Sequence, residues 1–181
     1  MDRVKLATVW FGGCSGCHMS FLDMDEFLID IADKIELVYS PIMDLKEYPK
    51  NVDIVFIEGA IVNDEQLHFV KTIRQKTKFV ISFGDCAVTG NVTAMRNPLG
   101  NASTILNRGY IENATLNQQI PAENDILPTL LDKVKSVHEV IPVDLFIPGC
   151  PPPADRIRYV IEKLLANEKP VLEGSNLKNC W

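Results

Sequence analysis

Four cysteines follow three apolar segments of the chain, and cysteine thiolates are ligands for soft metal ions and iron–sulfur clusters. Cys14 and Cys17 form a C-x-x-C pair, whereas Cys86 and Cys150 each follow a later apolar segment. Each segment has the length and composition of a buried parallel strand. Because ligands bind outside the carboxyl ends of such strands, we expect the four thiols to meet at one edge of a sheet. The sequence therefore predicts one four-thiolate metal site.

Three kinds of chemistry remain open for these thiols. Glycines beside each group favour an iron–sulfur cube, because they let backbone amides approach inorganic sulfides; they are Gly12, Gly13, Gly16, Gly84 and Gly149. Turn formation explains the same glycines without a cluster. A zinc site is the second alternative, although structural zinc usually takes closely spaced ligand pairs in domains that lack a core. A thiol redox pair is the third, and it leaves two cysteines unexplained.

Strand and helix patterns alternate along the chain. Short apolar runs predict strands at 5–11, 35–39, 53–57, 79–83 and 143–147, and helical periodicity appears at 21–31, 64–76 and 157–165. Such alternation implies right-handed crossovers, with helices on both faces of a parallel sheet. The fold class predicted is α/β: one flavodoxin-like, doubly wound domain over residues 1–181, with strand order 2-1-3-4-5. The stretch 90–124 lacks a clear period, and we expect it to pack on a partner chain.

Composition narrows the class of protein. The chain has 181 residues, 46% of them hydrophobic, so it can build a core without disulfides. A net charge of −6 and no visible basic patch argue against nucleic acid as a partner. The sequence shows no signal-peptide pattern and no long apolar span, which predicts a cytoplasmic chain without a membrane span.

Four motifs in order resemble the small subunit of nickel–iron hydrogenases, and the likeness covers nearly the whole chain. Among these it is most similar to the short small subunit of cytoplasmic bidirectional, NAD(P)-linked enzymes. The motifs are Gly13-Cys14-Ser15-Gly16-Cys17-His18-Met19-Ser20, Ile57-Glu58-Gly59-Ala60, Gly84-Asp85-Cys86-Ala87 and Pro148-Gly149-Cys150-Pro151-Pro152.

The resemblance implies a division of labour between chains. Cys14, Cys17, Cys86 and Cys150 would bind one proximal [4Fe-4S] cluster, and the nickel–iron centre would lie in a separate large subunit. Electrons would pass between that centre and an iron–sulfur and flavin diaphorase module that reduces NAD(P)+. Glu58, at the end of the third strand, is a candidate proton relay; the structural alternatives are that it caps a neighbouring loop or pairs with a cation across the interface.

Departures from related families refine the interpretation. Longer uptake-type small subunits carry an export signal and further cluster ligands, whereas only Cys180 is left over here, so one cluster is expected. The related respiratory complex I subunit has adjacent cysteines in its first motif, while Ser15 and Gly16 separate Cys14 from Cys17. FMN on this chain is left open but unsupported, because no phosphate loop follows the first strand.

Single residues near the motifs are expected to be structural. His18 is expected in a first helical turn, and Asp85 in a turn or cap. Trp10, Phe11 and Phe83 are expected to pack around the site or in the core.

Overall fold

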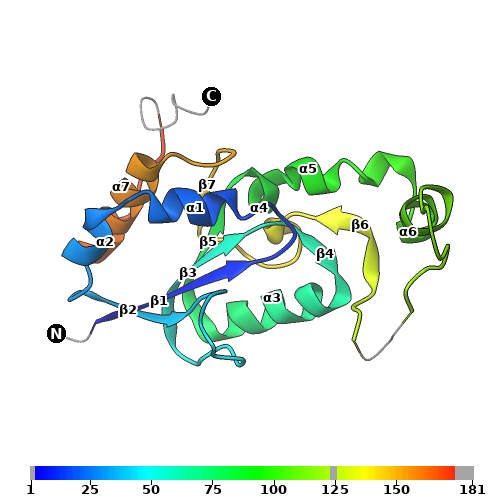
Figure 1. The fold of residues 1–181 in the computed structure, drawn as a ribbon. Coiled ribbons are helices and arrows are strands. Elements are labelled where there is room, and N and C mark those ends of the chain that lie inside the picture. Colours follow the sequence, from blue (N-terminus) through cyan, green and yellow to red (C-terminus); the bar gives the residue numbers. More distant parts are fainter. Residues whose placement is uncertain (1–2, 123–125, 174–181) are drawn as a thin grey trace.

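A parallel sheet of five strands lies at the centre of the structure (Figure 1), a computed structural model that describes residues 3–122 and 126–173. The strands are β1 (Val4–Trp10), β2 (Ile35–Tyr39), β3 (Val52–Glu58), β5 (Thr77–Phe83) and β7 (Leu145–Ile147). Their order across the sheet is β2-β1-β3-β5-β7, and every neighbouring pair is parallel. The predicted order 2-1-3-4-5 is therefore confirmed.

Helices cover both faces of this sheet (Figure 1). Helices α1 (Gly16–Leu22), α2 (Glu26–Asp30) and α7 (Ala154–Leu165) form one layer, and α3 (Asp64–Lys76) lies on the other face with a short 3-10 turn, η3 (Val137–Glu139). Two buried clusters, one on each face, make up the core. Both faces are covered because a parallel sheet needs its crossover helices on either side.

Alternation along β3 assigns its side chains to the two clusters. Val55 and Ile57 pack toward α3, while Phe56 packs on the opposite face against the rings of Phe21 and Phe83. Successive strand residues point to opposite faces, so Glu58 follows Phe56 toward the α1 layer. The alternation therefore places the Glu58 carboxylate in a largely apolar layer, where the residue is only 2% exposed.

The helix predicted over 21–31 is wrong as a single element. The chain forms α1 and α2 with a break between them, and Asp25 adopts a positive φ of 49°. The apolar period survives the break, since Met24, Phe27 and Ile31 are all buried against the sheet. The apolar side chains therefore still pack on the sheet at helical spacing. Asp23 and Asp25 interrupt the helix itself, because aspartate favours turns and caps over helix interiors.

The last strand is shorter than predicted. The carboxylate of Asp144 accepts a hydrogen bond from the Val80 N–H at 2.8 Å. The backbone N–H of Asp144 donates to the Val80 carbonyl at 2.9 Å. A side chain therefore takes the ladder position of a backbone carbonyl, and regular pairing with β5 begins only at Leu145. Arg74 also binds the Asp144 carboxylate, at 2.6 Å.

The region 90–124 contains more regular structure than its sequence predicts. After α4 (Asp85–Thr89) the chain forms α5 (Asn91–Ala94), the 3-10 turn η1 (Asn97–Leu99), α6 (Ala102–Asn107) and the π-helical turn η2 (Arg108–Glu112). These short elements lie beside an antiparallel pair that the sequence did not indicate, β4 (Ile61–Asn63) with β6 (Leu130–Lys135).

Two polar side chains hold this region to β6. Arg96 donates to the Leu131 carbonyl at 2.6 Å, and Asn97 both accepts from the Val134 N–H and donates to its carbonyl, at 2.7 and 2.9 Å. The anchoring contacts are polar and specific to tertiary structure, so they leave no hydrophobic period in the sequence.

Cys180 lies outside the described residues. Among the helices that the structure describes, none has the length and apolar content needed to cross a bilayer.

Candidate metal centre

The first cysteine pair lies in a loop held between β1 and the segment that follows β3. Gly12 exchanges backbone hydrogen bonds with Ala60, at 2.9 and 2.8 Å, before the chain turns into Cys14. A Cβ on Gly12 would lie 2.4 Å from the Val62 side chain, so the close approach requires glycine. Cys14 is exposed, and Cys17 is buried in the first turn of α1.

The carboxylate of Glu58 caps α1 from a distant part of the chain. Its two oxygens accept the backbone N–H groups of Cys17 and His18, at 3.3 and 2.9 Å. The same carboxylate contacts Nδ1 of the His18 ring. The first turn of a helix has no internal partners for its N–H groups, so a buried acceptor stabilises it. Glu58 thus fixes the turn that carries Cys17, and its capping role falls on a helix rather than on the loop expected from the sequence.

The second and third cysteine loops are joined directly. Asp85 donates its N–H to the Gly149 carbonyl at 2.9 Å, and its carboxylate accepts the Gly149 N–H at 2.7 Å. Asp85 is therefore structural, as expected, but it connects two loops rather than closing one turn. Cys86 follows it and is buried, whereas Cys150 is exposed.

These loops bring the four cysteines together. Gly84 lies so close to Cys17 that an added Cβ would be 2.1 Å from Sγ. Burial raises the pKa of the Cys17 thiol far above its ordinary value, and the charges of Glu58 and of the other three cysteines raise it further. Charges on the other three sulfurs can act on Cys17 only if they lie near it, so the four sulfurs share one region. This is the arrangement predicted from the positions of the cysteines after the strands.

The donor set fits an iron–sulfur cluster. Burial raises the pKa of Cys86 as well, and neighbouring Cys150 and Cys14 add to the effect. The raised pKa values mean that the Cys17 and Cys86 thiols resist ionisation unless a cationic centre is present, and bound metal deprotonates such thiols. Cys14, Cys17, Cys86 and Cys150 would hold the cluster, with Gly84 leaving the space beside Cys17 free of a side chain.

A single-ion site is less well matched. Within residues 3–122 and 126–173, no group of three or more His, Cys, Asp or Glu side chains is arranged to hold one metal ion. A four-iron cube makes a different demand, because each thiolate binds its own iron atom. Four thiolates from three separate loops suit such a cube, whereas structural zinc usually takes closely spaced ligand pairs.

Asn91 is a neighbour of the site that the sequence did not single out. Its side-chain amide donates to Cys150 Sγ at 3.3 Å, and the next backbone N–H, of Val92, donates to the Cys86 thiol. The only signal in the sequence was its place five residues after Cys86, inside the stretch without a period.

The aromatic residues near the site differ in their environments. Phe11 and Phe83 are buried, as expected, but Trp10 is 48% exposed and does not belong to the core. Trp10 ends β1 and lines a hollow of about 610 Å³ with Tyr39 and Phe69. His18 lies in the first turn of α1, as expected, and its Nε2 is buried without a hydrogen-bond partner among the described residues.

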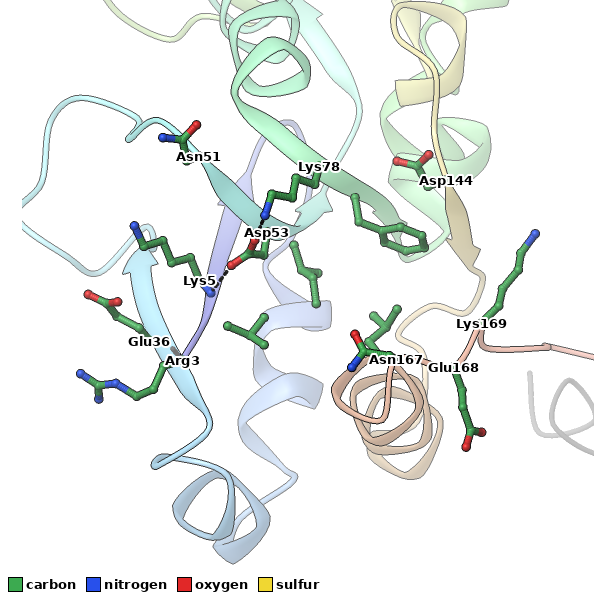
Figure 2. A pocket seen from close by; sticks show the side chains of 14 residues that line it. Arg3, Lys5, Glu36, Asn51, Asp53, Lys78, Asp144, Asn167, Glu168 and Lys169 are labelled. Atoms are coloured by element: carbon green, nitrogen blue, oxygen red, sulfur yellow. Dashed lines mark hydrogen bonds and ion pairs between the residues drawn. The ribbon is translucent and has the colours of Figure 1, made fainter. Parts of the chain in front are cut away.

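A second hollow, of about 1240 Å³, lies at the opposite, amino edge of the sheet (Figure 2). Asp53 is at its centre and accepts from the Lys5 N–H at 2.9 Å and from Lys78 Nζ at 2.7 Å. Hydrogen bonds from these partners lower the pKa of Asp53 despite the opposing effect of partial burial. The cysteines are absent from its lining, and its charges are mixed, so its size alone assigns it no chemistry.

Comparison with known proteins agrees with this geometry. Residues 14–164 match the family described as NADH ubiquinone oxidoreductase, 20 Kd subunit. The chain belongs to this family. The matched range begins at Cys14 and includes all four cysteines of the site.

Two curated relatives of the chain are described as hydrogenase subunits. An F420-non-reducing hydrogenase subunit of Methanothermobacter marburgensis is 42% identical over 182 residues, which cover 97% of this chain and 58% of that protein. The chain thus spans less than two thirds of that relative. The delta subunit of the NAD-reducing hydrogenase HoxS of Cupriavidus necator is 38% identical over 172 residues, covering 93% of this chain and 81% of that protein.

A solved structure described as an NAD+-reducing [NiFe]-hydrogenase in the H2-reduced state matches with a TM-score of 0.92 and 31% identity. The match covers 98% of this chain and 99% of the solved one. The resemblance to hydrogenase small subunits, first drawn from four motifs, is thereby confirmed. The adjacent-cysteine pattern expected of the respiratory complex I subunit is not present here, since two residues separate Cys14 from Cys17.

Replacing Gly84 tests the cradle beside Cys17. In Gly84→Ala the added Cβ would overlap Cys17 Sγ, and the φ of +82° is costly for any residue with a Cβ, by about 1–3 kcal/mol. We expect most of the bound iron to be lost while far-UV circular dichroism retains its helical signal. Gly109→Ala is the matched control, because its Cβ meets nothing within 4 Å. Full iron content in Gly84→Ala would contradict the placement of the site.

Proposed function

We propose that this chain is the electron-transfer small subunit of a nickel–iron hydrogenase that works in the cytoplasm. Cys14, Cys17, Cys86 and Cys150 hold one proximal [4Fe-4S] cluster between the nickel–iron centre of a large subunit and an NAD(P)-reducing diaphorase module. The observation that carries the proposal is the meeting of the three cysteine loops at the carboxyl edge of the sheet. When bound, the cluster supplies a one-electron carrier.

The role of this chain is to hold the cluster in a fixed position and to shield part of it from water. Glu58 fixes the α1 turn through two backbone N–H groups, and Asp85 ties the Cys86 and Cys150 loops together. Cys17 and Cys86 are buried, which shields their side of the site from water. Such fixed geometry limits the rearrangement that accompanies each electron transfer. The similarity to the NAD-reducing hydrogenase of Cupriavidus necator supports NAD(P)+ as the final acceptor and a reversible reaction.

An apolar surface beside the site supports a partner that covers it. In the α5–η1 segment the polar Arg96 and Asn97 bind β6, whereas Val92 and Met95 are 53% and 71% exposed. This is the reverse of the usual arrangement, in which apolar side chains face inward. Val92 also contacts Cys86 through its N–H, so the same partner would cover the open side of the site. We assign this surface to the large subunit.

Anaerobic purification through a tag on this chain tests the proposal. We expect about four irons per chain, a broad absorption near 400 nm, a [4Fe-4S]+ signal by electron paramagnetic resonance (EPR) after dithionite reduction, and nickel on a larger co-purifying chain. Zinc without iron would replace the proposal with a zinc-stabilised interaction module. A reversible Cys14–Cys17 disulfide without metal would replace it with thiol redox chemistry.

A charge on the α5–η1 surface tests the partner assignment. Met95→Glu would bury an unpaired carboxylate in the interface, so we expect binding of the large chain to weaken by about 2 kcal/mol or more, roughly thirtyfold. Co-purification yield and analytical gel filtration measure this loss, with iron content of the small chain unchanged. Ile29→Glu on α2 is the matched control at a 76% exposed apolar residue. Equal recovery of the large chain with Met95→Glu and wild type would refute the assignment.

A proton-relay role for Glu58 stays a prediction beside its capping role. Replacement by glutamine keeps the shape and one acceptor oxygen, but it removes the ionisable carboxyl and turns the other acceptor of the α1 cap into an N–H donor. Loss of a positioned acid–base group typically costs a factor of about 100 or more. We expect hydrogen–deuterium exchange by the Glu58→Gln complex to fall by that factor. Iron content and partner binding are measured on the same samples, because a loss of either would show that the cap, and not the relay, had been removed. Exchange at the wild-type rate would reject the relay and leave Glu58 as a helix cap.

A further inference from the structure

Asn91 occupies a backbone position that directs its side chain at the open end of the cysteine site. Gly90 and Asn91 have φ values of +86° and +35°, and asparagine is among the few side chains that tolerate positive φ. A Cβ on Gly90 would lie 2.7 Å from the Ala94 Cβ, so the turn is tightly packed. The hydroxyl of Thr93 donates to the Gly90 carbonyl at 2.5 Å and holds the turn closed.

The turn is joined to α4 as well. The Gly90 N–H donates to the Cys86 carbonyl at 3.0 Å, and the Ala94 N–H donates to the Gly90 carbonyl at 3.1 Å. The Cys86 loop and the Asn91 side chain are therefore parts of one rigid unit. The amide nitrogen of Asn91 reaches Cys150 Sγ at 3.3 Å, across 59 residues of sequence.

We propose that Asn91 is a positioning residue that raises the reduction potential of the cluster by donating a side-chain N–H to the sulfur of Cys150. The inference rests on the proposed function, because it requires the four cysteines to hold a cluster. Hydrogen bonds to ligand sulfurs are among the factors that set the potential of iron–sulfur centres.

The direction of the effect follows from charge. Reduction adds one electron and no proton to the cluster, which changes [4Fe-4S]2+ to [4Fe-4S]+ and increases the negative charge on the thiolate sulfurs. A donor N–H interacts more strongly with the more negative state, so it favours reduction. Loss of one hydrogen bond to a charged acceptor corresponds to roughly a factor of ten in the equilibrium.

Asn91→Gly is the informative variant, because glycine accepts the positive φ and removes only the donor. In an EPR-monitored redox titration of the anaerobic complex, we expect the ratio of reduced to oxidised cluster at the wild-type midpoint to fall about tenfold. For a one-electron couple this is a shift of about 59 mV to lower potential. Asn91→Asp keeps the shape, cannot donate and adds charge, so its midpoint should fall further.

A matched control lies at the opposite edge of the sheet. Asn51 has a φ of +58° and lines the hollow around Asp53 (Figure 2), whose lining contains none of the cysteines. Asn51→Gly makes the same chemical change at a similar backbone geometry, so its midpoint should equal that of the wild type.

The outcomes separate this inference from the proposed function. A wild-type preparation without a [4Fe-4S] signal would overturn both. A normal wild-type signal with an unchanged midpoint in Asn91→Gly would overturn only the role of Asn91, even if Asn91→Asp shifts through its charge. Should Asn91→Gly fail to retain the cluster, electron spin echo envelope modulation of wild type labelled with 15N at asparagine side chains decides. We expect the wild type to show a 15N coupling that Asn91→Asp lacks. If the wild type shows no such coupling, the proposal is refuted.

Discussion

The parallel pairing of β1, β3, β5 and β7 is the constraint on which the cysteine site depends, because it brings the carboxyl ends of these strands to one edge. Each cysteine loop leaves from one of those ends. Side-chain contacts then hold the loops in place at this edge. Glu58 at the end of β3 binds the α1 turn, and Asp85 after β5 binds the loop after β7. Without the shared edge, neither contact would have a partner within reach.

Electrostatics explains why these contacts are needed. Four thiols crowd one region, and burial together with the neighbouring charges raises the pKa of Cys17 and Cys86. Ionised thiolates at this edge would repel one another in the absence of a cationic centre. Fixed N–H donors, from Val92 and the side chain of Asn91, face two of the sulfurs and oppose that repulsion. The protein therefore supplies four thiols, a rigid frame and donors that favour the charged state.

Much of the central fold could be predicted from short apolar runs, because a strand buried on both faces has few other sequences available to it. The segment 35–39 coincides with β2, and 64–76 with α3. The break after α1 could not be predicted in the same way, since the apolar period continues through Met24 and Phe27 while the backbone turns. The pairing of β4 with β6 was also missed, because both strands are short and distant in sequence.

For the site, the identity and order of the four cysteines, with their flanking glycines, were determined by the sequence alone, because ligand type and loop position can be read from the residues. Tertiary structure decided what surrounds them. It brought the Glu58 carboxylate to α1, left Trp10 half exposed and directed the Asn91 amide at Cys150. These contacts join residues about 40 to 60 positions apart through single polar atoms. Isolated polar contacts of this kind have no periodicity, so only the folded chain reveals them.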